Sequence, residues 1–349
     1  RSKERRAPGL IVPGDRLDGG GAATEAAQRE LAQAALRRGC TLFDTAERYS
    51  IGAGESLLQK AVEHGPRRPI VATKFTPTPW RRGADSVVEA CEASRARLGV
   101  ESIDLYQIHM PDIVQPGRVL GYVDYKDEKY WAGLARCVEL GLVKEVGVSN
   151  YGATRLRKCR DFLADNFGVS LASNQIHYSL LARNQGGNQA TVDAAKELGV
   201  KTLAYYPLAR GLLASAARTD KFAAGALSHY ARGGTGYVGF SPKNRVVVPP
   251  PGVQPLVDAL ETVGARYGKT VSQVALNWVV CQGVIPIVGA TTEKYLDDAL
   301  GALGWRLSAD DREYLESVAD GLGFEFRGTF FKRVDSKFVG YGVESWALD

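Results

Sequence analysis

Short apolar runs rich in β-branched residues alternate with amphipathic helical patterns along most of this 349-residue chain. Strands that are each separated by a helix favour a parallel sheet, and the regular spacing predicts an α/β fold closed into a (β/α)8 barrel. The runs that predict strands are residues 41–44, 70–74, 103–109, 144–148, 171–176, 202–205 and 284–288. The helical patterns are residues 23–38, 55–63, 84–98, 129–140, 152–164, 188–198 and 271–281.

An eighth strand has to precede the first helix for such a barrel to close. The segment Pro8-Gly-Leu-Ile-Val-Pro13 is the candidate, although it is short and ends in proline. No Gly-x-Gly-x-x-Gly follows the first strand, which counts against a doubly wound dinucleotide-binding fold. After the strand at 202–205, the Gly-rich segment 214–251 predicts a long loop, and loops of this length are often lids or disordered pieces.

The end of the chain differs from the alternating part. We predict a barrel domain over residues 1–320 and a C-terminal extension over residues 321–349. Aromatic residues at this density do not suit a free linker, so the extension is expected to wrap the barrel or to dock onto a protein partner. The aromatic residues of the extension are Phe324, Phe326, Phe330, Phe331, Phe338, Tyr341 and Trp346.

Composition excludes several classes of function. The net charge of +5 (44 basic against 39 acidic residues) is mild and concentrated in the first six residues, so no nucleic-acid partner is expected. The five cysteines show no Cys-x-x-Cys spacing, which argues against a zinc site or a disulfide framework, and we expect no metal. No run of 18 apolar residues exists, so no membrane span is predicted.

Four polar residues stand at or just past the ends of predicted strands: Asp44, Tyr49, Lys74 and His109. In a parallel barrel the C-terminal strand ends converge on one site and hold their side chains rigidly. A phenol is a poor acid at its reference pKa of about 10, and a nearby ammonium lowers that pKa. A carboxylate can hold the lysine in place. The set therefore suits proton donation to a carbonyl oxygen.

Seven motifs, in order over about residues 24–310, resemble those of the aldo-keto reductases. The amino-acid sequences of several stretches are most similar to those of plastid members from plants and algae. The motifs are Asp44-Thr-Ala-Glu-Arg-Tyr49, Ala72-Thr-Lys-Phe75, Arg97-Leu-Gly99 with Asp104-Leu-Tyr-Gln-Ile-His109, Val146-Gly-Val-Ser-Asn150, Asn174-Gln-Ile-His-Tyr-Ser-Leu180, Tyr205-Tyr-Pro-Leu-Ala-Arg-Gly211 and Ile285-Pro-Ile-Val-Gly289.

The resemblance implies a chloroplast enzyme that reduces a small aldehyde or ketone to an alcohol with NADP(H) bound across the C-terminal rim. Tyr49 would donate the proton, Lys74 paired with Asp44 would lower the pKa of the phenol, and His109 would orient the carbonyl. Amide and aromatic groups suit the nicotinamide carboxamide and ring. The residues expected to bind the cofactor are Ser149, Asn150, Gln175, Tyr205, Leu208, Gly211, Gly289, Thr291 and Thr292.

The chain departs from the family pattern at the adenine end of the cofactor site. Thr291, Tyr295 and Ala299 stand where members usually carry a cation, a Gln or Arg, and an Asn. A phosphate needs cationic or multiple N–H donors, so NAD(H) is an alternative cofactor unless Lys294 or Arg210 substitutes.

The sequence also supports an alternative function and expectations for several other residues. The alternative function is a barrel recruited as a structural or regulatory subunit, with weak or no cofactor binding and the aromatic extension as its contact. His177 is expected at the surface or rim, and Asp104 as a structural hydrogen-bond partner. Trp80, Tyr130 and Trp131 either line a substrate pocket or cap the core.

Overall fold

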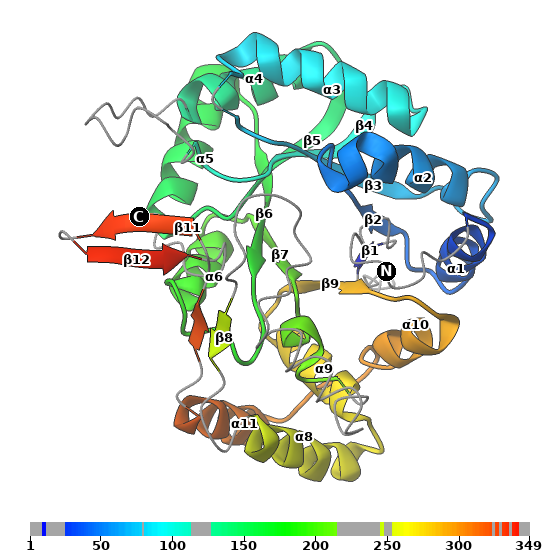
Figure 1. The fold of residues 1–349 in the computed structure, drawn as a ribbon, viewed down its shortest axis with the longest axis vertical. Helices are drawn as coiled ribbons and strands as arrows, with labels where there is room; N and C mark the ends of the chain where they lie inside the picture. The colour runs from blue at the N-terminus through cyan, green and yellow to red at the C-terminus, as the bar shows by residue number, and fades with distance from the viewer. Residues whose placement is uncertain are drawn as a thin grey trace.

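The structure, a computed structural model, describes residues 9–11, 25–78, 80–112, 127–214, 245–247, 253–322, 325–327, 330–334 and 337–341. Parallel strands form a closed barrel in the order β1-β2-β3-β4-β5-β6-β7-β9, which confirms the predicted (β/α)8 fold (Figure 1). Its strands are β1 Gly9–Ile11, β2 Leu42–Asp44, β3 Ile70–Phe75, β4 Ile103–Ile108, β5 Val143–Ser149, β6 Leu171–His177, β7 Lys201–Tyr205 and β9 Ile285–Gly289.

The short first strand closes the barrel. Leu10 of β1 pairs with Phe43 of β2 on one side and with Val288 of β9 on the other. The prolines at positions 8 and 13 flank the three paired residues. A proline cannot donate to a sheet ladder, which agrees with the shortness of this strand.

Helices form the outer ring of the barrel (Figure 1). Thr270 begins α9 with a capping box, in which its side chain accepts from the Gln273 amide and the Gln273 side chain accepts from the Thr270 amide. The predicted bounds of α3 and α9 match the structure, whereas α8, α10 and α11 were not predicted. The helices are α1 Glu25–Arg37, α2 Ala53–Val62, α3 Ala84–Leu98, α4 Asp127–Glu139, α5 Ala153–Phe167, α6 Asn188–Glu197, α8 Gln254–Tyr267, α9 Val271–Cys281, α10 Glu293–Leu300 and α11 Ala309–Gly321.

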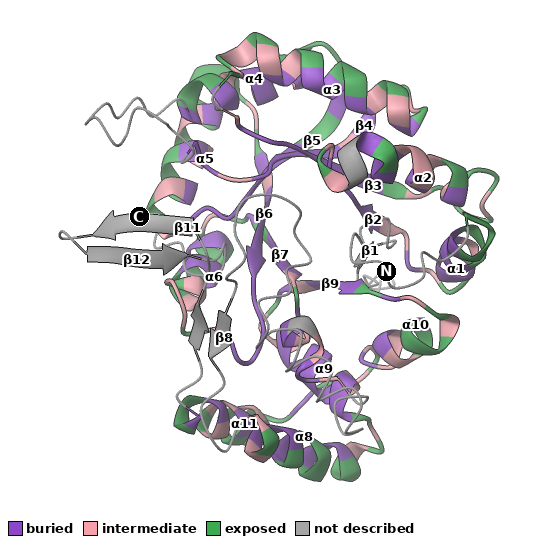
Figure 2. Ribbon diagram, in the orientation of Figure 1, coloured by how far each residue is buried: buried purple, intermediate pink, exposed green. Residues whose placement is uncertain are grey.

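The core lies between the strands and the helix faces turned toward them (Figure 2). On the α8–α11 side it is centred on Trp278, whose ring stacks on Tyr178 at a centroid distance of 5.4 Å. The Trp278 Nε1 donates to Glu316 Oε1 at 2.8 Å, so the buried indole has a hydrogen-bond partner. All five cysteines are free, and burial raises the pKa of the Cys40 thiol to about 12.

The C-terminal extension forms strands. β10 (Glu325–Arg327) pairs antiparallel with β8 (Arg245–Val247), which belongs to the long connection between β7 and α8. β11 (Phe330–Val334) and β12 (Lys337–Tyr341) form a hairpin (Figure 1). Two of the aromatic residues highlighted in the sequence, Phe324 and Trp346, lie outside the described residues. None of the helices in the described ranges has the length and apolarity that a membrane crossing requires.

Candidate active site

The polar residues expected at one site come from the C-terminal ends of successive strands. The strands run parallel, so their C-terminal ends meet at one end of the barrel. Asp44 ends β2, Lys74 lies near the end of β3, His109 follows β4, Ser149 ends β5, Gln175 lies near the end of β6, Tyr205 ends β7 and Gly289 ends β9.

A buried ion pair lies at the centre of this end. Lys74 Nζ donates to Asp44 Oδ2 at 2.5 Å and to the Thr45 carbonyl at 2.8 Å. The two charged side chains are 0% and 1% exposed. Gln175 Nε2 donates to the other oxygen, Asp44 Oδ1, at 2.9 Å. Charges removed from water are tolerated only when both are paired and hydrogen-bonded, and this pair meets that condition across three strands.

Tyr49 lies directly beside this pair. It begins the short 3₁₀ turn η1 (Tyr49–Gly52), and the centroid of its ring is 5.2 Å from Lys74 Nζ. The ring meets His109 edge-on, with centroids 5.9 Å apart and an interplanar angle of 78°. A Cβ on Gly54 would lie 3.1 Å from Tyr49 Cβ, so glycine at that position lets α2 start close to the tyrosine. The structure therefore brings all four residues of the predicted catalytic set together.

His109 is buried, and two hydrogen bonds of its backbone fix its position. Its amide donates to the Phe75 carbonyl at 2.7 Å, and its carbonyl accepts from Asn150 Nδ2 at 3.0 Å. Burial lowers the pKa of His109 well below its usual value, and the positive charges of Lys74 and Arg48 add to the effect. The imidazole is therefore neutral at neutral pH, with one nitrogen as donor and the other as acceptor.

An amide cluster lies next to His109. Asn150 adopts a left-handed backbone conformation with φ of 62°, which asparagine tolerates better than most residues. Its Nδ2 donates to Ser149 Oγ at 3.0 Å, and its Oδ1 accepts from the Tyr205 hydroxyl at 2.8 Å. Ser149 Oγ donates to the Gln175 carbonyl at 2.8 Å. These buried groups present hydrogen-bond donors and acceptors side by side, which fits the edge of a carboxamide.

His177 was expected at the surface or rim and not as a ligand. It ends β6 at the C-terminal rim of the barrel, but it does not lie at the surface. It is buried, and its ring stacks on Tyr205 with centroids 5.5 Å apart and an angle of 13° between planes. The reason is the sheet register, which pairs His177 at the end of β6 with Tyr205 at the end of β7. His177 thus covers one face of the Tyr205 ring.

The remaining predicted cofactor residues lie in the segments around the ends of β7 and β9. Leu208 precedes the 3₁₀ turn η3 (Ala209–Gly211), whose last residue, Gly211, has φ of 97°. Gly289 is exposed, and Thr291 follows it closely. Thr292 caps α10, where its side chain accepts from the Tyr295 amide at 3.3 Å.

Acidic residues of α10 pair with Arg38, the residue that follows α1. Arg38 Nη2 donates to Glu293 Oε2 at 2.7 Å, and Arg38 Nε lies 2.6 Å from Asp297 Oδ1. Hydrogen bonds to Glu293 and Asp297 raise the pKa of Arg38. The first turn of α10 therefore carries a neutralised carboxylate next to Thr291 and Thr292.

Asp104 has the structural role expected of it. It lies near the start of β4, at the opposite end of that strand from His109, and accepts from the Val71 amide at 3.0 Å and from Lys144 at 2.9 Å. Burial alone would raise the pKa of Asp104, but hydrogen bonds from Arg68, Lys144 and the Val71 amide lower it below its usual value.

The three other aromatic residues separate into two groups. Tyr130 and Trp131 are buried in the core, so for them the core interpretation is correct. Trp80 is 77% exposed. Among the described residues, no group of three His, Cys, Asp or Glu side chains could hold a metal ion.

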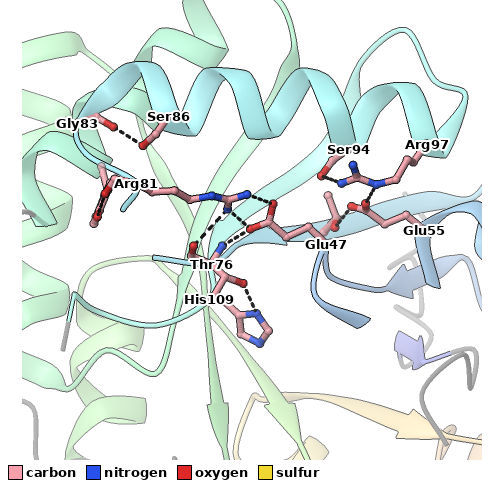
Figure 3. A network of polar contacts seen from close by, with 11 residues as sticks. Glu47, Glu55, Thr76, Arg81, Gly83, Ser86, Ser94, Arg97 and His109 are labelled. Carbon is pink, nitrogen blue, oxygen red and sulfur yellow. Dashed lines mark hydrogen bonds and ion pairs between the residues drawn. The ribbon is translucent and has the colours of Figure 1, made fainter. Parts of the chain in front are cut away.

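Three residues that the sequence did not single out contact the site. Glu47, Thr76 and Arg81 form a connected set of hydrogen bonds that ends on His109 (Figure 3). Glu47 lies inside the segment between Asp44 and Tyr49, and Thr76 follows Lys74 by two residues. Their position in the sequence, next to catalytic candidates, was the signal by which they could have been found.

Comparison with known proteins agrees with this fold. The family model described as the Aldo/keto reductase family matches residues 14–320. The chain belongs to this family and is an oxidoreductase. It is 35% identical over 296 residues to the chloroplastic pyridoxal reductase of Arabidopsis thaliana, which covers 82% of this chain and 74% of that protein. It is 31% identical over 306 residues to probable aldo-keto reductase 1 of Glycine max, covering 82% and 78% of the two chains.

Solved structures share the barrel. The Bombyx mori aldo-keto reductase in complex with NADP has a TM-score of 0.65 at 22% identity, covering 89% of this chain and 88% of that one. The Klebsiella pneumoniae aldo/keto reductase in complex with NADP and acetate has a TM-score of 0.63 at 24% identity, covering 90% and 91%. At these identities the likeness establishes the fold.

Proposed function

We propose that this protein reduces an aldehyde or ketone to an alcohol with NADPH, and that Tyr49 is the proton donor. The observation that carries the proposal is the buried Asp44–Lys74 pair with Tyr49 and His109 in ring contact around it. Charges this deeply buried are expensive, and their position beside a tyrosine and a neutral histidine suits acid catalysis.

Each side chain has a part in moving one proton. The Tyr49 phenol gives its proton to the carbonyl oxygen, and the Lys74 ammonium stabilises the phenolate that remains. Asp44 and the Thr45 carbonyl hold that ammonium in place. Neutral His109 donates a hydrogen bond from Nε2 to the same oxygen and orients it. NADPH, when bound, supplies the hydride that the carbonyl carbon takes up.

The amide cluster supports nicotinamide binding. Ser149, Asn150 and Gln175 would hold the carboxamide, because their buried donors and acceptors lie side by side at the ends of β5 and β6. Tyr205 would stack on the nicotinamide ring with the face that His177 leaves uncovered. Leu208, Gly211, Gly289, Thr291 and Thr292 would line the rest of the extended cofactor.

We infer a weaker preference for NADPH over NADH than the family usually has. Thr291 offers a hydroxyl where a cation is expected, and the Thr292 hydroxyl already caps α10. Lys294 is exposed on α10 and remains the first candidate to reach a 2′-phosphate.

The relatives also suggest where and on what the protein acts. The name of the Arabidopsis thaliana relative supports a chloroplast location and makes pyridoxal the first substrate to test. We infer that residues 1–320 form the reductase domain and residues 321–349 an extension. Pairing of β10 with β8 of the same chain favours an independent enzyme over a subunit that uses its tail to bind a partner.

The proposal is tested by comparing the wild type with Tyr49→Phe. Fluorescence titration should show that both proteins bind NADPH with nearly the same Kd, because the phenol acts on the substrate. Turnover of pyridoxal and of a panel of small aldehydes should fall about 10²–10⁴-fold in the variant.

Tyr314→Phe is the matched control, because Tyr314 is an exposed residue of α11 and should leave turnover unchanged. Near-wild-type turnover in Tyr49→Phe would contradict the proton-donor role. A wild type that binds neither NADPH nor NADH would favour the subunit alternative.

A further inference from the structure

We infer that Glu47 and Arg81 are positioning residues that clamp Thr76 against His109 and thereby select the His109 tautomer that donates from Nε2. This inference deepens the proposed function and rests on it for the role of His109. The evidence is a chain of hydrogen bonds from an ion pair at the rim to the buried imidazole (Figure 3).

The ion pair holds both backbone polar groups of Thr76. Glu47 Oε1 accepts from the Thr76 amide at 2.6 Å and also from Arg81 Nη1. Arg81 Nη2 donates to Glu47 Oε2 at 3.1 Å, which makes the pair bidentate. Arg81 Nη1 also donates to the Thr76 carbonyl at 3.2 Å. The N–H and the C=O of Thr76 are therefore both hydrogen-bonded to side chains that also pair with each other.

The clamp is sheltered and rigid. The Glu47 and Arg81 side chains are 7% and 29% exposed. The guanidinium lies 5.0 Å from the centroid of the Phe75 ring, and the Arg81 carbonyl accepts from the Tyr130 hydroxyl at 2.7 Å. Bidentate pairs of arginine and carboxylate fix geometry more strictly than single contacts do, and a partly buried pair is less screened by salt than an exposed one.

The clamped threonine contacts the imidazole directly. Thr76 Oγ1 lies 3.3 Å from His109 Nδ1, and both residues are buried. For Nε2 to carry the proton that faces a carbonyl oxygen, Nδ1 has to be an acceptor, so the Thr76 hydroxyl has to donate to it. A hydroxyl can donate or accept, and we assign it the donor role at Nδ1 because Nε2 is then left to carry the ring proton. Lys74 and Arg48 are the charged groups that act on this imidazole, and both are cations that favour its neutral form.

The clamp also joins the loops that carry the catalytic set. Glu47 lies three residues after Asp44 and two before Tyr49. Its backbone amide donates to the Lys74 carbonyl at 3.4 Å. One ion pair thus connects the segment after β2 to the segment after β3, and through Thr76 to His109 after β4. A misplacement of about 1 Å in such a set can reduce rate about a hundredfold.

A second, similar ion pair provides the control. Glu55 Oε2 accepts from Arg97 Nε at 2.6 Å (Figure 3). Glu55 Oε1 accepts from Thr73 Oγ1 at 2.6 Å. The Glu55 and Arg97 side chains are 0% and 32% exposed, which matches Glu47 and Arg81 closely. This pair joins α2, β3 and α3, and none of its contacts among the described residues involves Thr76 or His109.

The test compares Arg81→Gln and Thr76→Val with Arg97→Gln and Thr76→Ser. Nitrogen-15 NMR of the imidazoles reports the tautomer of His109, one of four histidines in the chain, and its signals are assigned by their loss in His109→Gln. We expect the Nε2–H tautomer in the wild type, Thr76→Ser and Arg97→Gln, and a mixture of tautomers in Arg81→Gln and Thr76→Val. Turnover should fall about tenfold to a hundredfold in the last two, with the NADPH Kd unchanged.

The outcomes separate this inference from the proposed function. If Arg81→Gln and Thr76→Val keep the wild-type tautomer and turnover, the inference is wrong. It is also wrong if Arg97→Gln shifts the tautomer as much as Arg81→Gln does. If the wild type reduces no carbonyl while the tautomers change as expected, the proposed function fails and the structural clamp stands. Thr76→Val keeps the backbone clamp, so it provides the test even if Arg81→Gln does not fold.

Discussion

Replacing Asp44 by asparagine should destabilise this protein far more than the loss of one hydrogen bond would. Asn keeps the shape of the side chain and one oxygen, so Lys74 or Gln175 still finds an acceptor. The negative charge is lost, and the Lys74 ammonium at 0% exposure is left without a counter-ion.

The magnitude follows from this burial. Removing one partner of a buried ion pair typically costs about 3–5 kcal/mol of the free energy of unfolding. An exposed pair costs less than about 1 kcal/mol. The pair between Lys60 and Glu25 is the matched control, because its side chains are 52% and 56% exposed and its atoms are 3.1 Å apart.

The assay is urea denaturation followed by tryptophan fluorescence for the wild type, Asp44→Asn, Lys74→Met, the double variant and Glu25→Gln. The double variant removes both buried charges, so it should be no less stable than Asp44→Asn. The sum of the two single effects should therefore exceed the double effect by at least about 3 kcal/mol, the cost of leaving one buried charge unpaired.

The reasoning is refuted if the two single effects add up in the double variant. It is equally refuted if Asp44→Asn costs no more than Glu25→Gln. Either result would mean that water reaches Lys74 in solution and that the pair is not desolvated.

Three further predictions concern the cofactor rim, the histidine and the barrel wall. Thr291→Lys should tighten NADPH binding by about 1.5–3 kcal/mol, or about tenfold to a hundredfold, without tightening NADH binding. The gain should shrink as the salt concentration rises. A wild type that already binds NADPH far more tightly than NADH would contradict this prediction. Burial lowers the pKa of His109, so below pH of about 6.5 the unfolded chain binds a proton that the folded chain does not. The free energy of unfolding should therefore fall by up to about 1.4 kcal/mol from pH 7.5 to 5.5, and His109→Gln should remove this contribution; equal slopes in the two proteins would contradict the prediction. Gly147→Ala would place a Cβ 2.3 Å from Ser173 Oγ and should cost about 1–3 kcal/mol in denaturation, whereas Gly321→Ala, with nothing within 4 Å, should not; equal costs would contradict it.

Much of the fold was predictable because its signals are local. Helices α3 and α9 begin and end where the hydrophobic periodicity predicts. The alternation of strand and helix implies a parallel barrel without knowledge of any long-range contact. Helices α8, α10 and α11 were not predicted, and the three-residue β1 was predictable mainly because a closed barrel requires an eighth strand.

The candidate site was predictable to the extent that its residues lie at strand ends. Asp44, Lys74 and His109 follow from the end of each apolar run, because parallel strands bring those ends together. The burial of His177 was not predicted because it depends on the register between β6 and β7, which the hydrophobic pattern does not encode.

The sequence by itself determined the barrel, the order of its strands and the set of groups available for proton transfer, because periodicity and strand ends are properties of neighbouring residues. Tertiary structure alone decided how those groups are held. The pairing of Glu47 with Arg81 joins residues 34 positions apart, and that of Gln175 with Asp44 joins residues 131 apart. A hydrogen bond depends on distance and direction in space, and those become defined only when the closed barrel places separate loops side by side.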